Sequence, residues 1–238
     1  MPTPERAIEY YFAIISVLGS LVVLLGIKYT LRRWRSFPET GWVPQAIAMG
    51  ILGLVLASFI ELPAMLLKAW VALAFLAGMA EEGVKLLPLK FFEGLDGWAR
   101  WKLVVGAGFF LGLIEGIFYT VGIFVLGQEW YLVIVRLVLI GLHTIWAVIS
   151  VGFLLGESGP RRFTGLVFSM AAHALYDLPS LAVLQGYSGN TVAYLAGLST
   201  GFLLVTPLMV RKATEVASVL SPPLGEEAPG TPTPEEKF

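Results

Sequence analysis

Residues 130–156 read WYLVIVRLVLIGLHTIWAVISVGFLLG, an apolar run in which Arg136 and His143 are the ionisable side chains. A helix that spans a membrane needs ~20 mostly apolar residues, so this stretch is long enough to cross a bilayer. Turn-forming sequences bound it, Gly127-Gln128 before it and Gly156-Glu157-Ser158-Gly159-Pro160 after it. The stretch therefore predicts a transmembrane helix.

Other stretches of the chain have the same character, so the sequence predicts about seven transmembrane helices. The remaining expected spans are 8–30, 44–61, 64–92, 103–127, 163–185 and 190–210. The overall composition agrees, because the 238-residue chain is 57% hydrophobic and 14% charged, whereas an ordinary soluble domain is ~45–50% apolar and ~25% charged. The expected fold class is an all-α, polytopic membrane helix bundle.

Composition also excludes several classes of function. The net charge is −1, which leaves no basic surface large enough for a nucleic-acid partner. The chain contains no cysteine, so disulfide scaffolds, thiol nucleophiles and cysteine-ligated metals are excluded. It contains two histidines, His143 and His173, and their scarcity makes their positions informative.

The distribution of lysine and arginine predicts the orientation of the bundle. Loops on one side carry most of these residues, whereas the opposite loops carry Arg6. The basic set is Lys28, Arg32, Arg33, Arg35, Lys90, Arg100, Lys102, Arg161, Arg162, Arg211 and Lys212. Because cytoplasmic loops are enriched in Lys and Arg, we expect a multi-pass protein of the cell (cytoplasmic or inner) membrane with its N-terminus outside and its C-terminus in the cytoplasm.

The chain is expected to divide into a transmembrane domain, residues 1–212, and a cytoplasmic tail, residues 213–238. From about Ser218 the sequence is rich in proline and glutamate and has no apolar period. Such a segment buries too little apolar surface to offset chain entropy, so the tail is expected to be disordered. The first apolar stretch is too long for a cleaved signal peptide and is expected to remain as an anchor.

Several ionisable side chains fall inside the expected spans, where lipid disfavours them. They are Lys68, Glu81, Glu82, Lys85, Glu115, Arg136, His143, His173 and Asp177. A charged side chain near the bilayer centre costs about 2.5–3.5 kcal/mol, so these groups are expected to face one another or a wet cavity, although Lys68 lies near a helix end and can reach the interface. A rise of ~1.5 Å per residue places polar groups of four helices near the midplane.

Helical spacing indicates which of these groups share a face. His173 and Asp177 are four residues apart and lie one turn from each other, as do Glu81 and Lys85. Glu82 points about 100° away from Glu81. Both glutamates can therefore reach a common cluster only if its cavity is wide.

The helix expected over 103–127 carries a stripe of small residues. Gly108, Gly112 and Gly116 recur at four-residue spacing, which allows close backbone contact with a neighbouring helix and places Glu115 beside that crossing. Arg136, on the next helix, is expected to be a structural counter-ion rather than a catalyst.

Two histidines and nearby carboxylates suit two kinds of chemistry. One is a Zn²⁺ site, because imidazole and carboxylate are normal zinc ligands and a catalytic site keeps one position for water. The other is a metal-free site in which a glutamate takes a proton from water. The sequences H-E-x-x-H and H-x-x-E-H are absent, so any ligands must come from separate helices. Two further motifs of intramembrane hydrolases carry little weight. Gly156-Glu157-Ser158-Gly159 has the G-x-S-G form of serine proteases, but it lies in an expected turn before Pro160. Tyr176-Asp177 has the Y-D form of aspartyl proteases, but no G-x-G-D follows it.

Four segments, in order, resemble the motifs of the PrsW family of intramembrane proteases, within the CAAX protease and bacteriocin-processing superfamily. Residues 81–85 (EEGVK) resemble its E-E-x-x-K motif, and residues 108–119 resemble a glycine- and phenylalanine-rich helix that carries a glutamate. Residues 136–146 resemble a helix with a single histidine, and residues 173–177 (HALYD) resemble H-x-x-x-D/N. The chain departs from the family pattern in its second motif, where phenylalanine and asparagine are usual and Leu111 and Gly116 stand here.

The resemblance implies an endopeptidase that hydrolyses peptide bonds of membrane-anchored proteins, such as a single-pass anti-sigma factor. By the same resemblance, Glu81 activates water for attack on the scissile amide. Four other residues ligate a metal ion, with Zn²⁺ as the candidate, or position the water and steady the oxyanion. They are Glu115, His143, His173 and Asp177.

Other motif residues receive supporting roles from the resemblance: Glu82 and Lys85 hold the site in shape, and Arg136 and Tyr119 support it. The sequence leaves open whether Glu81 or Glu82 is the base and whether a metal takes part. Two other functions also remain open. One is a proton- or cation-coupled transporter, since buried carboxylates and histidines form proton relays, although no internal repeat or broken helix is expected here. The other is a catalytically silent membrane scaffold of the same superfamily.

Overall fold

The fold is described from a computed structural model, which covers residues 3–39, 41–127 and 131–221. Every regular element in these ranges is helical, as the sequence predicts. The elements are α1 (Pro4–Ile14), η1 (Ile15–Gly19), α2 (Ser20–Trp34), α3 (Val43–Leu66), α4 (Trp70–Val84), α5 (Leu87–Phe91), α6 (Gly97–Val125), α7 (Tyr131–Gly156), η2 (Gly159–Phe163), α8 (Thr164–Leu184), α9 (Gly189–Val216) and η3 (Ala217–Leu220). Within the described ranges, six helical segments are long and apolar enough to cross a membrane, which indicates a multi-pass membrane protein.

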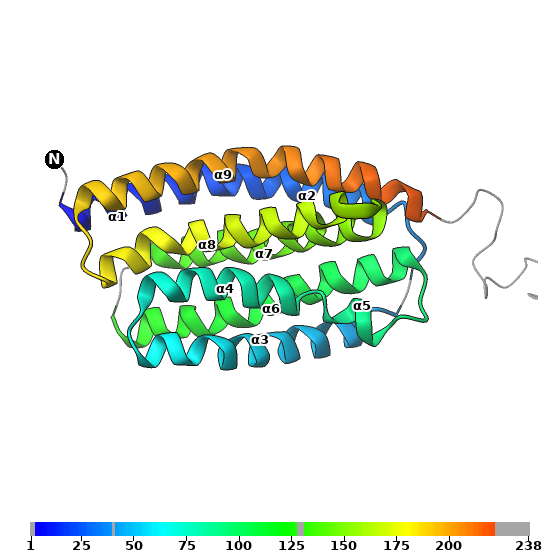
Figure 1. The fold of residues 1–238 in the computed structure, drawn as a ribbon, viewed down its shortest axis with the longest axis horizontal. Helices are drawn as coiled ribbons and strands as arrows, with labels where there is room; N and C mark the ends of the chain where they lie inside the picture. The colour runs from blue at the N-terminus through cyan, green and yellow to red at the C-terminus, as the bar shows by residue number, and fades with distance from the viewer. Residues whose placement is uncertain (1–2, 40, 128–130, 222–238) are drawn as a thin grey trace, which may run out of the picture.

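The long helices lie side by side along one axis (Figure 1). Helix α9 and the continuous α1–η1–α2 segment lie along one side, α7 and α8 occupy the middle, and α3, α4 and α6 lie along the other side. The two sides are therefore joined through α7 and α8.

Helix α7 is the centre of the bundle. In its most apolar window 67% of the residues are buried, against 22–44% in the other five candidate spans. The side chains from Ile145 to Ile149 are fully buried. Because α7 carries apolar side chains on every face, neighbouring helices can cover it all round. This packing holds His143 inside the protein rather than against lipid.

The expected span 64–92 is not one helix, and this prediction is wrong. Helix α3 continues through Pro63, and the chain then turns at Lys68, whose φ of 53° lies in the left-handed region and whose side chain is exposed. Helix α4 runs for 15 residues, and α5 follows after a turn that includes Leu86. At ~1.5 Å per residue α4 is about 22 Å long, shorter than a ~30 Å hydrocarbon core. It is therefore absent from the six candidate spans.

Smaller differences concern the ends of other helices. The span expected over 8–30 is a longer segment in which the π-helical turn η1 joins α1 to α2. Helix α9 continues past residue 212 to Val216 and η3 follows it, so the first residues of the expected tail are helical. The remainder of that tail, residues 222–238, lies outside the described residues, as does the expected helix start at Trp130.

Basic side chains gather at one end of the bundle. Figure 1 places the α2–α3, α5–α6 and α7–η2 connections together at the end opposite the start of α1. Lysines and arginines of these connections and of the adjacent helix ends include Arg32, Arg33, Arg35, Lys90, Arg100, Arg161 and Arg162. Among the described residues, the basic side chains at the opposite end are Arg6 and Lys68, so the two ends differ in their number of basic side chains, as the loop assignment predicts.

Candidate active site

Four helices bring the predicted site residues together. Helix α4 supplies Glu81 and Glu82, and helices α6, α7 and α8 supply one group each beside them: Glu115, His143 and His173. The His143 and His173 ring centroids are 5.0 Å apart. The predicted convergence of buried polar groups from separate helices is therefore confirmed.

Glycines permit the close helix crossings at this cluster. A Cβ built on Gly112 of α6 would lie 2.8 Å from His143 Cδ2 and 2.9 Å from His143 Cβ. A Cβ built on Gly78 of α4 would lie 2.8 Å from the backbone nitrogen of Ala174 on α8. Gly108 and Gly116 likewise face α7, so the predicted packing role of the α6 stripe is confirmed. The absence of side chains at these positions lets the two histidines approach α4 and α6.

Glu81 occupies the space between the two histidines. Its Oε2 atom is 3.7 Å from His143 Nδ1 and 4.0 Å from His173 Nε2. The residue is 6% exposed, and Oε2 makes no hydrogen bond with any described residue. A buried carboxylate oxygen without a hydrogen-bond partner is costly and marks a place where water, a proton or an ion is to be bound.

Glu82 has different surroundings, although it is the next residue on α4. Its Oε1 atom accepts a hydrogen bond from Lys85 Nζ and lies 3.0 Å from His173 Nδ1. Glu82 and Lys85 are both fully buried, and neither lines a cavity adjoining the site. The ~100° between successive helical side chains thus turns one glutamate toward the cavity and the other into the protein.

Glu115 joins one histidine to an arginine. Its Oε2 atom lies 3.0 Å from His143 Nε2, and its Oε1 atom lies 3.9 Å from Arg136 Nη1. The Arg136 guanidinium carbon lies 3.6 Å from the centroid of the Tyr119 ring. Arg136 is therefore held by a carboxylate and an aromatic face, which agrees with its predicted place as a counter-ion.

His173 is fixed on three sides. Its ring stacks on Trp146 with a centroid distance of 5.0 Å and an interplanar angle of 23°. Nδ1 is directed at Glu82, and Nε2 lies 3.5 Å from Asp177 Oδ2. Asp177 keeps 25% of its side chain exposed, so it connects the buried histidine to the cavity.

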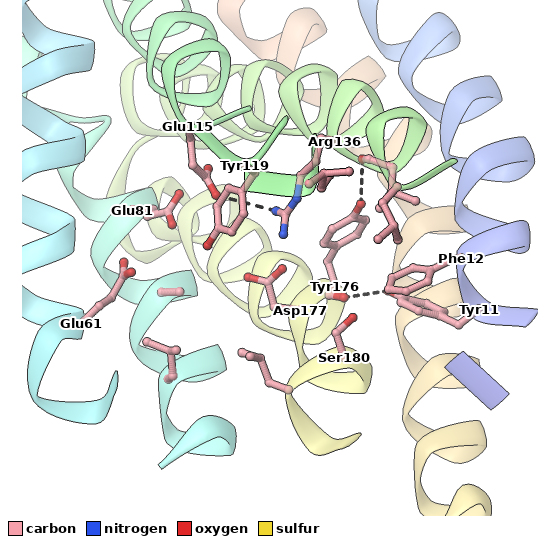
Figure 2. Close-up of a pocket in the computed structure, with 16 residues that line it drawn as sticks. Tyr11, Phe12, Glu61, Glu81, Glu115, Tyr119, Arg136, Tyr176, Asp177 and Ser180 are labelled. Atoms are coloured by element: carbon pink, nitrogen blue, oxygen red, sulfur yellow. Dashed lines mark hydrogen bonds and ion pairs between the residues drawn. The ribbon is translucent and has the colours of Figure 1, made fainter. Parts of the chain in front are cut away.

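Two cavities meet at this cluster. The first has a volume of about 260 Å³ and is lined by side chains of α1, α3, α4, α6, α7 and α8. Figure 2 shows Glu61, Glu81, Glu115 and Asp177 with their carboxylates turned toward this space. The second, of about 500 Å³, lies against α3 and α6 and shares Glu61, Glu81, Glu115 and Tyr119 with the first. Both cavities are large enough for water to reach Glu81.

Glu61 is a site residue that sequence reasoning missed. The expected span 44–61 ends at Glu61 and leaves it out of the ionisable side chains of the spans, but α3 continues to Leu66 and keeps Glu61 within the helix. The signal was present, since an acidic residue at the edge of an apolar span is costly unless it faces a polar space. Tyr11 was missed as well; its hydroxyl donates a hydrogen bond of 2.8 Å to the Tyr176 carbonyl at the wall of the first cavity.

Three buried residues can hold a metal ion. Glu81, His143 and His173 each offer a ligand atom, and these atoms lie within 4.8 Å of one another. The donor set suits zinc. A metal-bound histidine is commonly oriented by a carboxylate at its other ring nitrogen, and Glu82 occupies that place beside His173 Nδ1. The predicted ligand set included both histidines but had Glu115 and Asp177 in place of Glu81, and each of those carboxylates lies beside one histidine instead.

Ser158 lies just before η2 and lines neither cavity, so the structure places it apart from the cluster.

Comparison with known proteins adds no relative: no family model, no curated protein and no solved structure matches this chain.

Proposed function

We propose that this chain is an intramembrane endopeptidase of the PrsW type, which hydrolyses peptide bonds of membrane-anchored proteins. The observation that carries the proposal is the position of Glu81, a buried carboxylate that lies between two histidines, lacks a hydrogen-bond partner and borders both cavities. A carboxylate in this position is suited to take a proton from a water molecule.

In the proposed reaction, Glu81 takes a proton from water while the water oxygen bonds to the carbonyl carbon of the scissile amide. Glu81 then returns the proton to the amide nitrogen as the C–N bond breaks. His143 and His173 lie on either side of Glu81 and donate N–H groups to the developing oxyanion. Glu115 Oε2 and Asp177 Oδ2 lie 3.0 Å and 3.5 Å from the Nε2 atoms of His143 and His173.

Zinc remains a candidate cofactor within the same proposal. Glu81, His143 and His173 would hold the ion, and bound Zn²⁺ would supply Lewis-acid activation of water and of the carbonyl. Glu82 contacts His173 Nδ1, which leaves Nε2 facing Glu81 and Asp177.

The proposed topology retains seven crossings. Helix α4, the turn at Lys85 and Leu86, and α5 together form the third crossing, since α4 alone is too short. The basic end of the bundle faces the cytoplasm, so the N-terminus lies outside the cell membrane. The proposed substrate is a single-pass protein such as an anti-sigma factor, which brings its scissile bond to the site within the membrane.

Comparison of the wild-type chain with Glu81→Gln tests this proposal. Each is expressed in a cell that lacks the endogenous gene, and new protein N-termini in the membrane fraction are labelled and identified. We expect fragments of single-pass proteins with the wild type and none with Glu81→Gln. Glu157→Gln lies in the connection between α7 and η2, lines neither cavity, and should behave as the wild type. Identical N-termini from all three proteins, with equal amounts in the membrane, would contradict the assignment and favour a silent scaffold.

A cation- or proton-coupled transporter is a second candidate. The sequence predicted no broken helix, which argued against a transporter, but the structure has a break between α4 and α5. The helix ends immediately after the ion cluster, at Val84, and interrupted helices beside buried charges are frequent in transporters. Proton flux into proteoliposomes that depends on Glu81 would support this alternative. Absence of flux together with Glu81-dependent cleavage would exclude it.

A further inference from the structure

Glu61 is the carboxylate of the cavity that the proposed reaction does not use. It projects from α3 into the space shared by both cavities (Figure 2). Its Oε1 atom is buried, and the side chain forms no hydrogen bond or ion pair with any residue that the structure describes. Glu61 thus differs from every other carboxylate that lines the first cavity.

The charges around the first cavity explain why Glu61 stands apart. Glu115 is paired with Arg136, Asp177 lies beside His173, and Glu81 lies between the two histidines. Arg136 is the cationic side chain among the lining residues, and it is directed at Glu115 and Tyr119. The cavity therefore carries an excess of carboxylates that the described residues do not neutralise.

A second observation points to a ligand in the same space. Glu81 is more than nine-tenths buried, and its unpartnered Oε2 atom borders both cavities beside Glu61. Two buried carboxylate oxygens without partners are disfavoured in a low-dielectric interior. A positively charged group beside Glu61 would give its carboxylate a partner and leave Glu81 free to act on water.

The second cavity indicates what carries that positive charge. Apart from its shared polar residues and Ser58, it is lined by apolar side chains of α3 and α6, among them Val55, Phe59 and Phe118. Phe59 is 69% exposed and Phe118 is 68% exposed on the outer surface of the bundle. This groove is therefore apolar, open toward the lipid, and continuous with the carboxylates at its inner end. It suits an apolar membrane segment with one basic side chain near the bond to be cut.

We propose that Glu61 binds the ammonium or guanidinium group of a lysine or arginine in the membrane segment of the substrate. The apolar part of that segment lies in the groove between α3 and α6, and the basic side chain reaches inward to Glu61. Glu61 is thus a specificity-determining residue that places the neighbouring peptide bond near Glu81. This inference rests on the proposed function and adds the substrate class to it.

A binding experiment tests Glu61 without requiring cleavage. The probes are fluorescent, leucine-rich single-span peptides with one lysine, which is moved through successive positions, and matched peptides with glutamine at each position. Binding to the full chain in detergent micelles is followed by fluorescence anisotropy. With the wild-type chain, the lysine peptide is expected to bind about tenfold more tightly than the matched glutamine peptide for at least one lysine position. A tenfold difference in affinity is at the low end of what a charge-assisted hydrogen bond contributes.

Substitutions at Glu61 give the decisive comparison. Glu61→Gln is expected to bring the lysine-to-glutamine affinity ratio close to one, and Glu61→Lys is expected to favour a glutamate peptide at the same position. The control Glu157→Gln should keep the wild-type ratio. A wild-type ratio near one at every position, or a ratio that Glu61→Gln leaves intact, would overturn the proposal. Lysine-selective binding without any Glu81-dependent cleavage would instead contradict the protease assignment and retain the cationic subsite.

Discussion

Glu82 Oε1 lies 3.0 Å from His173 Nδ1, and the same oxygen accepts a hydrogen bond from Lys85 Nζ. This shared oxygen fixes the histidine ring so that Nε2 faces both Asp177 and Glu81. The two adjacent glutamates therefore have different surroundings. Glu81 borders the cavity, and Glu82 contacts the ring of His173, which faces Glu81. The distinction comes from tertiary packing, because spacing along the helix gives only the angle between them.

Removing the Glu82 carboxylate should destabilise the protein. Glu82→Leu leaves the ammonium group of Lys85 buried without its partner, and breaking a buried ion pair in this way costs about 3–5 kcal/mol. The double variant Glu82→Leu/Lys85→Met removes both charges, so its free energy of unfolding is expected to return toward the wild-type value. Reversible unfolding in mixed micelles gives these free energies. Equal destabilisation in the single and double variants would show that the pair is not the main cause.

Gly112 should be sensitive to a single added methyl group. The Cβ of Gly112→Ala would lie 2.8 Å from His143 Cδ2, so α6 and α7 must separate, and such overpacking costs about 1–3 kcal/mol. Gly122→Ala, on the same helix, is the matched control because nothing lies within 4 Å of its Cβ. The control is expected to be neutral or to gain up to about 1 kcal/mol from helix propensity. Thermal unfolding of both variants in one detergent measures the difference, and a loss of stability at Gly122 equal to that at Gly112 would contradict the packing argument.

The sequence predicted the bundle and most of the cluster for a simple physical reason. Buried charge in an apolar span is so costly that side chains such as Glu115 and His143 must meet partners, and the distances between them agree. The break after α4 was not predictable in this way, because residues 64–92 are mostly apolar despite their charged side chains. Average hydropathy does not register a turn. Glu61 was missed because the expected span ends at this residue, whereas the helix continues through Pro63 to Leu66.

Tyr11 should stabilise the contact of α1 with α8 and α9. Its hydroxyl donates to the Tyr176 carbonyl at 2.8 Å and lies 2.6 Å from Ser199 Oγ, and the residue is 1% exposed. Tyr11→Phe leaves these buried groups without a partner, which costs about 1–3 kcal/mol. Tyr10→Phe is the control, since Tyr10 is 64% exposed, and it should leave the free energy of unfolding within about 0.5 kcal/mol of wild type. Similar free energies of unfolding for the two variants would show that the Tyr11 hydroxyl does not help to hold α1 in place.

Metal content should depend on Glu82 as well as on the residues that can contact the ion. If Glu81, His143 and His173 hold zinc, the purified chain should contain about one zinc per molecule, and His143→Ala and His173→Ala should lose it. Glu82→Gln keeps all three ligands but weakens the contact that orients His173, so its zinc affinity is expected to fall by about 10–100-fold. Elemental analysis and competition with a chromogenic chelator measure these quantities, and Glu157→Gln serves as the control. Wild-type chain that binds no zinc while Glu81-dependent cleavage persists would show that the carboxylate activates water without a metal. Zinc bound equally by wild type and both alanine variants would place the ion elsewhere in the protein.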